Sequence, residues 1–141
     1  MSRKPMWMVR AEVGGKYFED FKAKSIVAIG WVELGDMKSL SNREAFTQAV
    51  TKAYPEMKKM QVAISAGQLY RFAREMKVGD RVLTYDPSGR VYLVGTINSD
   101  YFYDPSFIED DPNCRRVVWE GEVPRDLLSV STKNSLGAIS T

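Results

Sequence analysis

The sequence predicts an α+β fold, and two observations support this. Up to residue 76, apolar runs typical of strands alternate with apolar residues at helical spacing, whereas short apolar runs between turn residues dominate the part that follows. A chain that is mixed at first and mainly strands later is typical of the α+β class. The 141 residues, 44% of them hydrophobic and 27% charged, suffice for one globular core. We therefore expect residues 1–141 to form a single domain.

The first half of the chain alternates between apolar runs and helical patterns. The run from Ile26 to Trp31 is continuously apolar and rich in β-branched residues, which is typical of a buried strand. Ser41 and Glu44 have the spacing of a capping box that begins a helix, and Pro55 ends it. The expected elements are a strand at 6–10, a turn at 14–15, a short helix at 17–24, a strand at 26–31, and helices at 41–53 and 62–76.

Strands and turns make up most of the second half. Pro87, Ser88 and Gly89 form a typical turn between two strands. Trp119, like Trp7 in the first strand, lies mid-strand among apolar neighbours and is expected in the core. The expected elements are strands at 81–85, 91–97 and 115–122, an acidic and aromatic loop at 100–111, one helical turn at 124–128, and a tail rich in Ser and Thr.

The residue types that are missing restrict the chemistry. The chain has no histidine and a single cysteine, Cys114, which excludes Ser-His-Asp and Cys-His catalysis, imidazole metal ligands and an internal disulfide. We expect no catalytic residue, no metal site and no cofactor. No apolar run reaches the roughly 20 residues that span a bilayer. The basic N-terminus is not followed by the apolar stretch of a secretory signal, so we expect a cytoplasmic protein without membrane contact.

Two stretches of sequence carry a family resemblance. The phrase REMKVGD at 74–80, with a strand to Tyr85 and a return to Gly95, resembles the EVE domains of the PUA-like superfamily. Those domains also carry a glutamine shortly before the last helical turn, which Gln68 matches. A more specific match, over nearly the whole chain, resembles the N-terminal region of Mrr-like restriction endonucleases. It rests on MWMVRA at 6–11, IVAIGW at 26–31, QLYRF at 68–72 and SVSTKNSLG at 129–137.

The resemblance implies both a fold and a function. The fold would be a mixed, strongly bent β-sheet or partly open barrel flanked by helices. The function would be the DNA-binding specificity module of a modification-dependent restriction endonuclease, which serves antiviral defence and reads a modified base flipped into an aromatic pocket. The partners would be DNA carrying that base and a C-terminal nuclease domain of the parent protein. This chain lacks an Asp…Glu-x-Lys strand motif, so it is expected to be a non-catalytic reader cut from a longer protein.

Candidate walls of the base pocket lie where strands end. Trp31 ends an apolar strand beside Gly30, although a tryptophan there can also belong to the core. Tyr85 could stack on a base, and Asp86 could accept a hydrogen bond from an exocyclic amine. Asp86 is equally typical of the first position of a β-turn. The full set of expected base-pocket residues is Trp31, Ser65, Gln68, Tyr85, Asp86, Tyr101 and Tyr103.

The densest basic stretch of the chain supplies candidate phosphate contacts. Basic residues on and around the helix at 62–76 would face the DNA backbone, although a solvated helix face is the default explanation for them. The low net charge of +2 means that such binding needs a local patch together with a pocket. The expected phosphate-binding residues are Lys58, Lys59, Arg71, Arg74, Lys77, Arg81, Lys133 and Asn134.

Three other functions stay open. PUA-like domains also bind RNA, so the chain could read a modified RNA. It could also be a protein-interaction module that binds no nucleic acid. The third function is a small enzyme with a divalent metal held by the acidic loop, although a solvated loop is the simpler interpretation. The carboxylates concerned are Asp100, Asp104, Glu109, Asp110 and Asp111.

Overall fold

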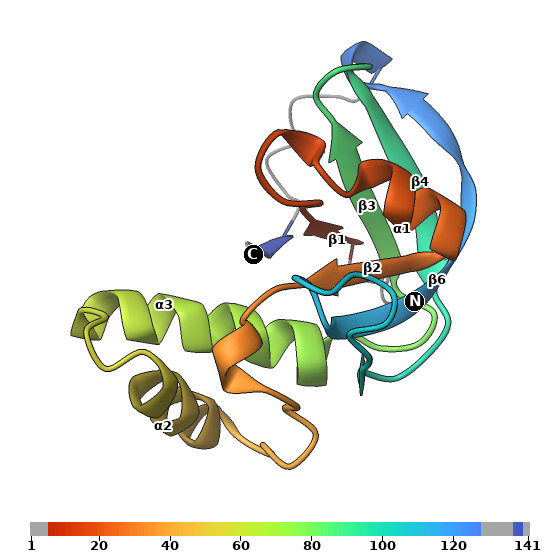
Figure 1. Cartoon of the computed structure of the whole chain (residues 1–141). Helices are drawn as coiled ribbons and strands as arrows, with labels where there is room; N and C mark the ends of the chain where they lie inside the picture. Colours follow the sequence, from red (N-terminus) through yellow and green to blue (C-terminus); the bar gives the residue numbers. More distant parts are fainter. Residues whose placement is uncertain (1–5, 128–136, 140–141) are drawn as a thin grey trace.

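A computed structural model describes residues 6–127 and 137–139. Its centre is a strongly curled sheet that forms half a barrel, with one helix over its concave face and two helices to one side (Figure 1). The α+β class and the bent, partly open sheet expected from the sequence are both confirmed. The strands are β1 (Met6–Val9), β2 (Ile26–Ile29), β3 (Arg81–Asp86), β4 (Val91–Ile97), β5 (Phe102–Tyr103), β6 (Asn113–Pro124) and β7 (Gly137–Ile139).

The sheet is mixed, and its strand order is β2-β6-β4-β3-β1-β7. β1 lies parallel to both β3 and β7, whereas the other pairs are antiparallel. β6 is the longest strand and changes partners along its length. Its first part, from Asn113 to Arg116, pairs with β2, and the part from Val117 onward pairs with β4. This change of partner curls the sheet toward a barrel.

A bulge sharpens the bend of β6. The register between β4 and β6 shifts at Val94 and Gly95, so that Trp119 opposes Gly95 while Gly121 opposes Val94. Gly95 is required there, because a Cβ atom on it would lie 2.6 Å from the carbonyl oxygen of Val118. The absence of a side chain thus lets the two backbones approach closely.

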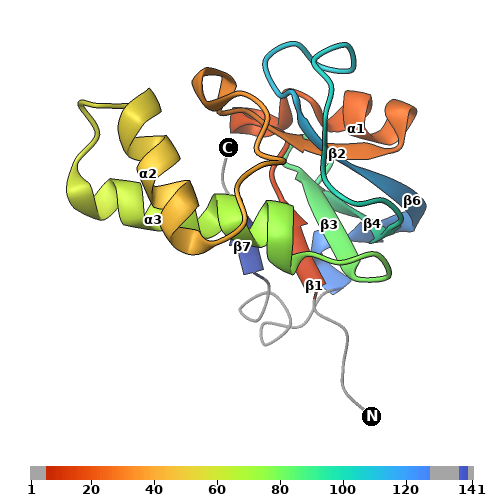
Figure 2. The ribbon, with the colours of Figure 1, turned by 90° about the horizontal axis from the view of Figure 1, so that it is seen from below.

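Two helices lie beside the half-barrel and one lies over it. α1 (Phe18–Lys24) lies over the concave face of the sheet, whereas α2 (Arg43–Ala53) and α3 (Lys59–Tyr70) pack across each other at a steep angle to one side (Figures 1 and 2). α3 continues directly into a π-helical turn, η3 (Arg71–Glu75), which leads to β3. Single 3-10 turns are η1 (Val13–Gly15), η2 (Val32–Leu34) and η4 (Arg125–Leu127).

Some element boundaries differ from those expected. Asn42, not Ser41, caps α2, since the Asn42 side chain accepts a hydrogen bond of 2.9 Å from the Ala45 backbone N–H. The capping-box prediction was therefore wrong by one residue. The next helix begins at Lys59 rather than at residue 62, and β2 ends two residues before Trp31. The short strands β5 and β7 were not expected.

The core fills the space between the curled sheet and the helices. Phe21 of α1, Phe46 of α2 and Phe72 of η3 are all fully buried. Trp7 is buried as expected, and its Nε1 donates a hydrogen bond of 3.0 Å to Asp80. Trp119 is partly buried, and its Nε1 donates to the Phe21 carbonyl. Among the described residues, no helix is both long and apolar enough to cross a membrane.

Candidate functional site

Strained backbone marks the corner where β1 and β2 end. Glu12, three residues beyond β1, has φ 66°, and Trp31, two residues beyond β2, has φ 59°. Side chains other than glycine rarely adopt such values, and each instance costs about 1–3 kcal/mol. Such strain persists only where the surrounding structure holds the residue in place, and it is found most often at binding and active sites. Gly30 lies between the two and is buried.

Two carboxyl groups converge on Gly30. A Cβ atom on this glycine would lie 3.3 Å from Asp111 Oδ1 and 3.8 Å from Glu12 Oε2. Asp111 is fully buried, and no donor in the described part of the chain reaches either of its carboxyl oxygens. The pKa of Asp111 is raised to about 8, chiefly by burial and in addition by the adjacent Glu12 carboxyl. Asp111 therefore keeps its proton near neutral pH and can bond through it to Glu12.

The indole of Trp31 adds an unpaired donor to this corner. Its Nε1 is buried and has no hydrogen-bond partner within the described residues. The ring itself is held edge-on against Tyr54, with centroids 5.5 Å apart and an interplanar angle of 83°. Buried polar groups are nearly always paired, and an orphan costs about 1–3 kcal/mol. Trp31 and Asp111 thus each hold buried polar atoms without a partner in the described chain. We call the corner at Glu12, Gly30, Trp31 and Asp111 the carboxyl corner.

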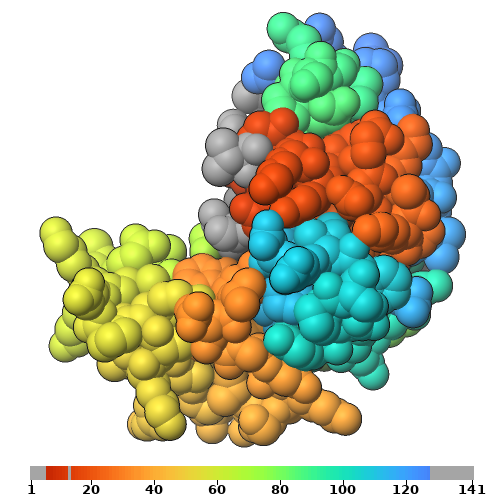
Figure 3. Space-filling model, in the orientation of Figure 1, coloured from red at the N-terminus to blue at the C-terminus, as the bar shows by residue number. Residues whose placement is uncertain are grey.

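Three segments distant in sequence meet around the carboxyl corner. The segment after β1, the segment after β2 and the loop before β6 adjoin one another in the space-filling view (Figure 3). Tyr17 ties the first segment to the loop, because its hydroxyl donates a 2.6 Å hydrogen bond to Asp110. Asn113 ties the loop to the second, because its side-chain amide donates to the Gly30 carbonyl. These bonds hold Asp111 in place next to Gly30.

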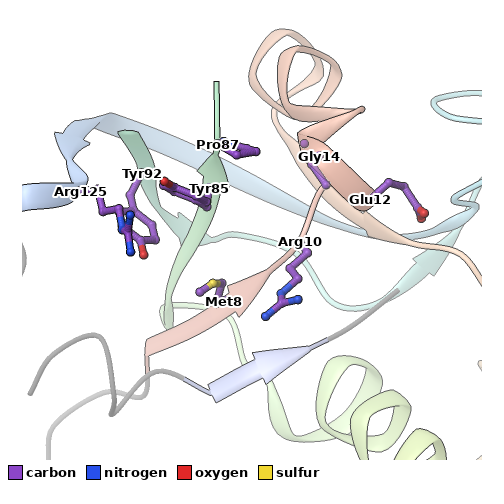
Figure 4. Close-up of a pocket in the computed structure, with 10 residues that line it drawn as sticks. Met8, Arg10, Glu12, Gly14, Tyr85, Pro87, Tyr92 and Arg125 are labelled. Atoms are coloured by element: carbon purple, nitrogen blue, oxygen red, sulfur yellow. The ribbon is translucent and has the colours of Figure 1, made fainter. Parts of the chain in front are cut away.

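A cavity of about 560 Å³ begins at Glu12 and extends between β1 and the β3–β4 hairpin. Its size is in the range of small-ligand sites. Tyr85 and Tyr92, Tyr92 being buried, are cross-strand neighbours there with ring centroids 4.8 Å apart. Figure 4 shows these tyrosines and Arg125 together at one end of the cavity and Glu12 at the other. Met8 of β1 and Arg10, which follows β1, lie between them. We call this space the tyrosine cavity.

The structure does not bring all the expected base-pocket residues together. Tyr85 lines the tyrosine cavity, but Trp31 does not. Asp86 turns into the β3–β4 hairpin, where its Oδ1 accepts from the Ser88 backbone N–H. That contact is the one expected of a turn-forming aspartate.

The remaining four expected residues lie elsewhere. Ser65 is fully buried on α3 beside Met57, and Gln68 is half-buried on the same helix. Tyr101 donates a 2.6 Å hydrogen bond to Asn113 and accepts one from the Met37 backbone N–H. Tyr103 is exposed on β5. None of the four lines the tyrosine cavity.

The expected phosphate contacts also separate. Arg74, within η3, and Lys77, two residues after η3, line a second cavity. Arg81 forms an ion pair of 3.3 Å with Glu120. Lys58 and Lys59 are exposed at the start of α3, and Arg71 is half-buried at its end. Lys133 and Asn134 lie outside the described residues.

Several residues of the site were missed by sequence reasoning. Asp111 was expected only as part of a solvated acidic loop or a metal site, yet it is buried. Within the described residues, no group of three or more acidic or cysteine side chains is placed to hold a metal. Tyr92 had a usable signal, because a hairpin that turns at 87–89 sets it opposite Tyr85. Glu12 and Arg125 had none, because only the folded chain brings them to the cavity.

Comparison with known proteins yields one match. A family model described as Domain of unknown function (DUF8426) matches residues 7–137, which is most of the chain. No curated protein and no solved structure matches.

Proposed function

The chain belongs to the family Domain of unknown function (DUF8426), and we propose that it is a non-catalytic module that recognises a modified base in DNA. The observation that carries the proposal is the carboxyl corner, where the buried Trp31 Nε1 has no acceptor and the buried Asp111 oxygens have no donor in the described chain. The edge of a nucleobase presents donors and acceptors side by side, so it can satisfy such a set.

The chemistry of the corner fits a base edge. The Trp31 N–H can donate, and the oxygens of Asp111 and Glu12 that their shared proton leaves free can accept from an exocyclic amine. A site built around buried polar groups rejects a ligand that leaves them unpaired far more strongly than an apolar site does. The carboxyl corner would therefore supply the selectivity.

The tyrosine cavity supplies affinity in this proposal. Base–aromatic stacking is worth about 1–3 kcal/mol per base. Flipping a base out of a duplex costs a few kcal/mol, so stacking and two or three hydrogen bonds are enough to offset it. Arg10 and Arg125, which line the same cavity, could contact phosphates that flank the flipped nucleotide.

In this proposal the chain recognises the DNA and a separate nuclease domain cleaves it. A chain without histidine, and without an Asp…Glu-x-Lys strand motif, offers few groups for phosphodiester cleavage. Cleavage would be performed by a nuclease domain outside residues 1–141, as the resemblance to Mrr-like endonucleases implies. The chain itself would only select the site.

Binding to matched duplexes tests the proposal. Affinities would be measured by fluorescence anisotropy for one duplex sequence carrying cytosine, 5-methylcytosine, 5-hydroxymethylcytosine, adenine or N6-methyladenine at a single position. We expect at least one modified duplex to bind tenfold or more tightly than its unmodified counterpart. Equal affinities throughout would refute base recognition in DNA. A matched single-stranded RNA that competes better than any duplex would instead favour the RNA-reading alternative.

A further inference from the structure

The second cavity has a strongly unbalanced charge. It measures about 580 Å³ and lies between η3, the turn that follows it and the loop before β5. Four cationic side chains line it against one carboxylate, that of Asp100. The cationic residues are Lys38, Arg74, Lys77 and Arg115. None of these four forms an ion pair shorter than 4 Å within the described part of the chain.

Arg115 is the most unusual of the four, because its side chain is buried, with 1% of its surface exposed. Its Nη1 donates a 2.8 Å hydrogen bond to the Phe72 carbonyl, and its Nε donates one of 3.0 Å to the Ser99 carbonyl. Burial lowers its pKa to about 10, against the opposing effect of Asp100. Nη2 makes no hydrogen bond to a described residue, so the guanidinium keeps donors for a ligand.

Arg74 holds the segment that carries Lys38. Its Nε donates to the Leu40 carbonyl at 2.8 Å, and its Nη2 donates to the carbonyls of Met37 and Lys38. These bonds fix the backbone next to Lys38 without neutralising the positive charge of Arg74. Tyr101, which also lines the cavity, is fixed by its hydroxyl's hydrogen bonds to the Met37 backbone N–H and the Asn113 side chain. These hydrogen bonds hold the residues that line the cavity in place, and they do not neutralise the positive charge of its Lys and Arg side chains.

We propose that this cavity, lined by Lys38, Arg74, Lys77 and Arg115, binds a phosphate group. A planar guanidinium with free donors and ammonium groups around it is the usual protein site for phosphate oxygens. A bound phosphate supplies the negative charge that the cavity lacks. The phosphate belongs either to a nucleic-acid backbone or to a free ion, and both sources require the same chemistry. The proposal does not depend on base recognition at the carboxyl corner.

Single-charge variants test the cavity without disturbing the fold. Lys38→Gln and Lys77→Gln each remove one exposed ammonium group, and neither residue has an ion pair among the described residues. Lys52→Gln on α2 removes the same charge from an exposed position outside the cavity and serves as the matched control. Two measurements are made on each protein: calorimetric titration with inorganic phosphate, and the salt dependence of affinity for an unmodified duplex.

The two measurements separate the sources of the phosphate. Saturable binding of inorganic phosphate that Lys38→Gln and Lys77→Gln weaken at least fivefold, and Lys52→Gln does not, would support a free-ion site. For DNA, each cavity variant should reduce the slope of log affinity against log salt by about one, because one phosphate contact is lost. Lys52→Gln should leave the slope unchanged.

Clear results would overturn the proposal. It fails if neither cavity variant changes phosphate binding or the salt slope, or if Lys52→Gln changes them equally. Failure of base recognition looks different: the wild-type protein would then bind modified and unmodified duplexes equally while the cavity variants still lower the slope. The cavity variants should weaken both duplexes by the same factor, since phosphate contacts carry no base information.

Discussion

Glu12 and Asp111 bring their carboxyl groups together at Gly30, although Glu12 follows β1 and Asp111 precedes β6, far apart in the sequence. Both carboxyls lie within 3.8 Å of the position that a Gly30 Cβ atom would occupy. The backbone of Glu12 is strained at this point, with φ 66°, and Asp111 is fully buried. A pair of carboxyls held this close favours the state in which they share one proton. This relationship has consequences for stability and for binding.

The stability of the protein should fall as pH rises from about 4 to about 8. The pKa of Asp111 is raised in the folded chain to about 8, whereas a carboxyl in the unfolded chain titrates near 4. Between these values the unfolded chain releases the proton that the folded chain keeps, so higher pH favours unfolding. Asp111→Asn should remove this contribution and increase stability at pH 8 relative to wild type. Urea denaturation at pH 5, 6, 7 and 8 measures the effect.

A matched variant controls for the loss of a carboxylate. Glu56→Gln removes a carboxylate from an exposed position, where no pairing is present among the described residues. Its pH dependence should match that of wild type. If Asp111→Asn and Glu56→Gln give the same urea midpoints at every pH, then the buried carboxyl pair is not present in solution.

Gly95→Ala should destabilise the fold by about 1–3 kcal/mol, the usual cost of overpacking. The added Cβ atom would lie 2.6 Å from the Val118 carbonyl oxygen and 2.7 Å from the Trp119 ring. Gly121→Ala, on the same bulge, adds a Cβ atom with no heavy atom within 4 Å and should be nearly neutral. Urea midpoints of the two variants measure the difference. Equal midpoints would mean that β4 and β6 do not meet in this register.

Tyr85→Ala should weaken binding to the preferred modified duplex by about 1–3 kcal/mol, because one stacking surface is lost. Tyr85→Phe keeps the ring and should bind within about twofold of wild type. Tyr103→Ala removes an exposed tyrosine outside the tyrosine cavity and should have little effect. Anisotropy titrations compare the three variants. A loss for Tyr103→Ala that equals the loss for Tyr85→Ala would place the bound base somewhere other than this cavity.

The local parts of the fold were predictable, because local patterns determine them. The apolar run of β2, the turn at 87–89 and the helical spacing after residue 62 each specify their element within a few residues. The cap of α2 shows the limit of such reasoning. Ser41 and Asn42 are both good capping residues, and the extended backbone of Asn42, φ −139°, decides between them.

The candidate site was harder to predict, since contacts distant in sequence assemble it. The sequence shows five carboxylates around the loop at 100–111 but not which one becomes buried. Asp111 is buried because Asn113 and the Asp110–Tyr17 contact hold the loop against Gly30. Arg115 looks like any charged residue at the start of a strand, yet the fold surrounds it with carbonyl groups. Pairings of this kind depend on topology rather than on local pattern.

The most direct test of base recognition compares wild type with Trp31→Phe on one pair of duplexes that differ only in the preferred modification. Phenylalanine keeps a ring against Tyr54 but removes the Nε1 donor, which is buried and unpaired in the described chain. We predict that wild type prefers the modified duplex tenfold or more, and that Trp31→Phe loses most of this preference while its urea midpoint stays close to that of wild type. The account would be contradicted if wild type bound the modified and unmodified duplexes with equal affinity, or if Trp31→Phe kept the full preference for the modified duplex.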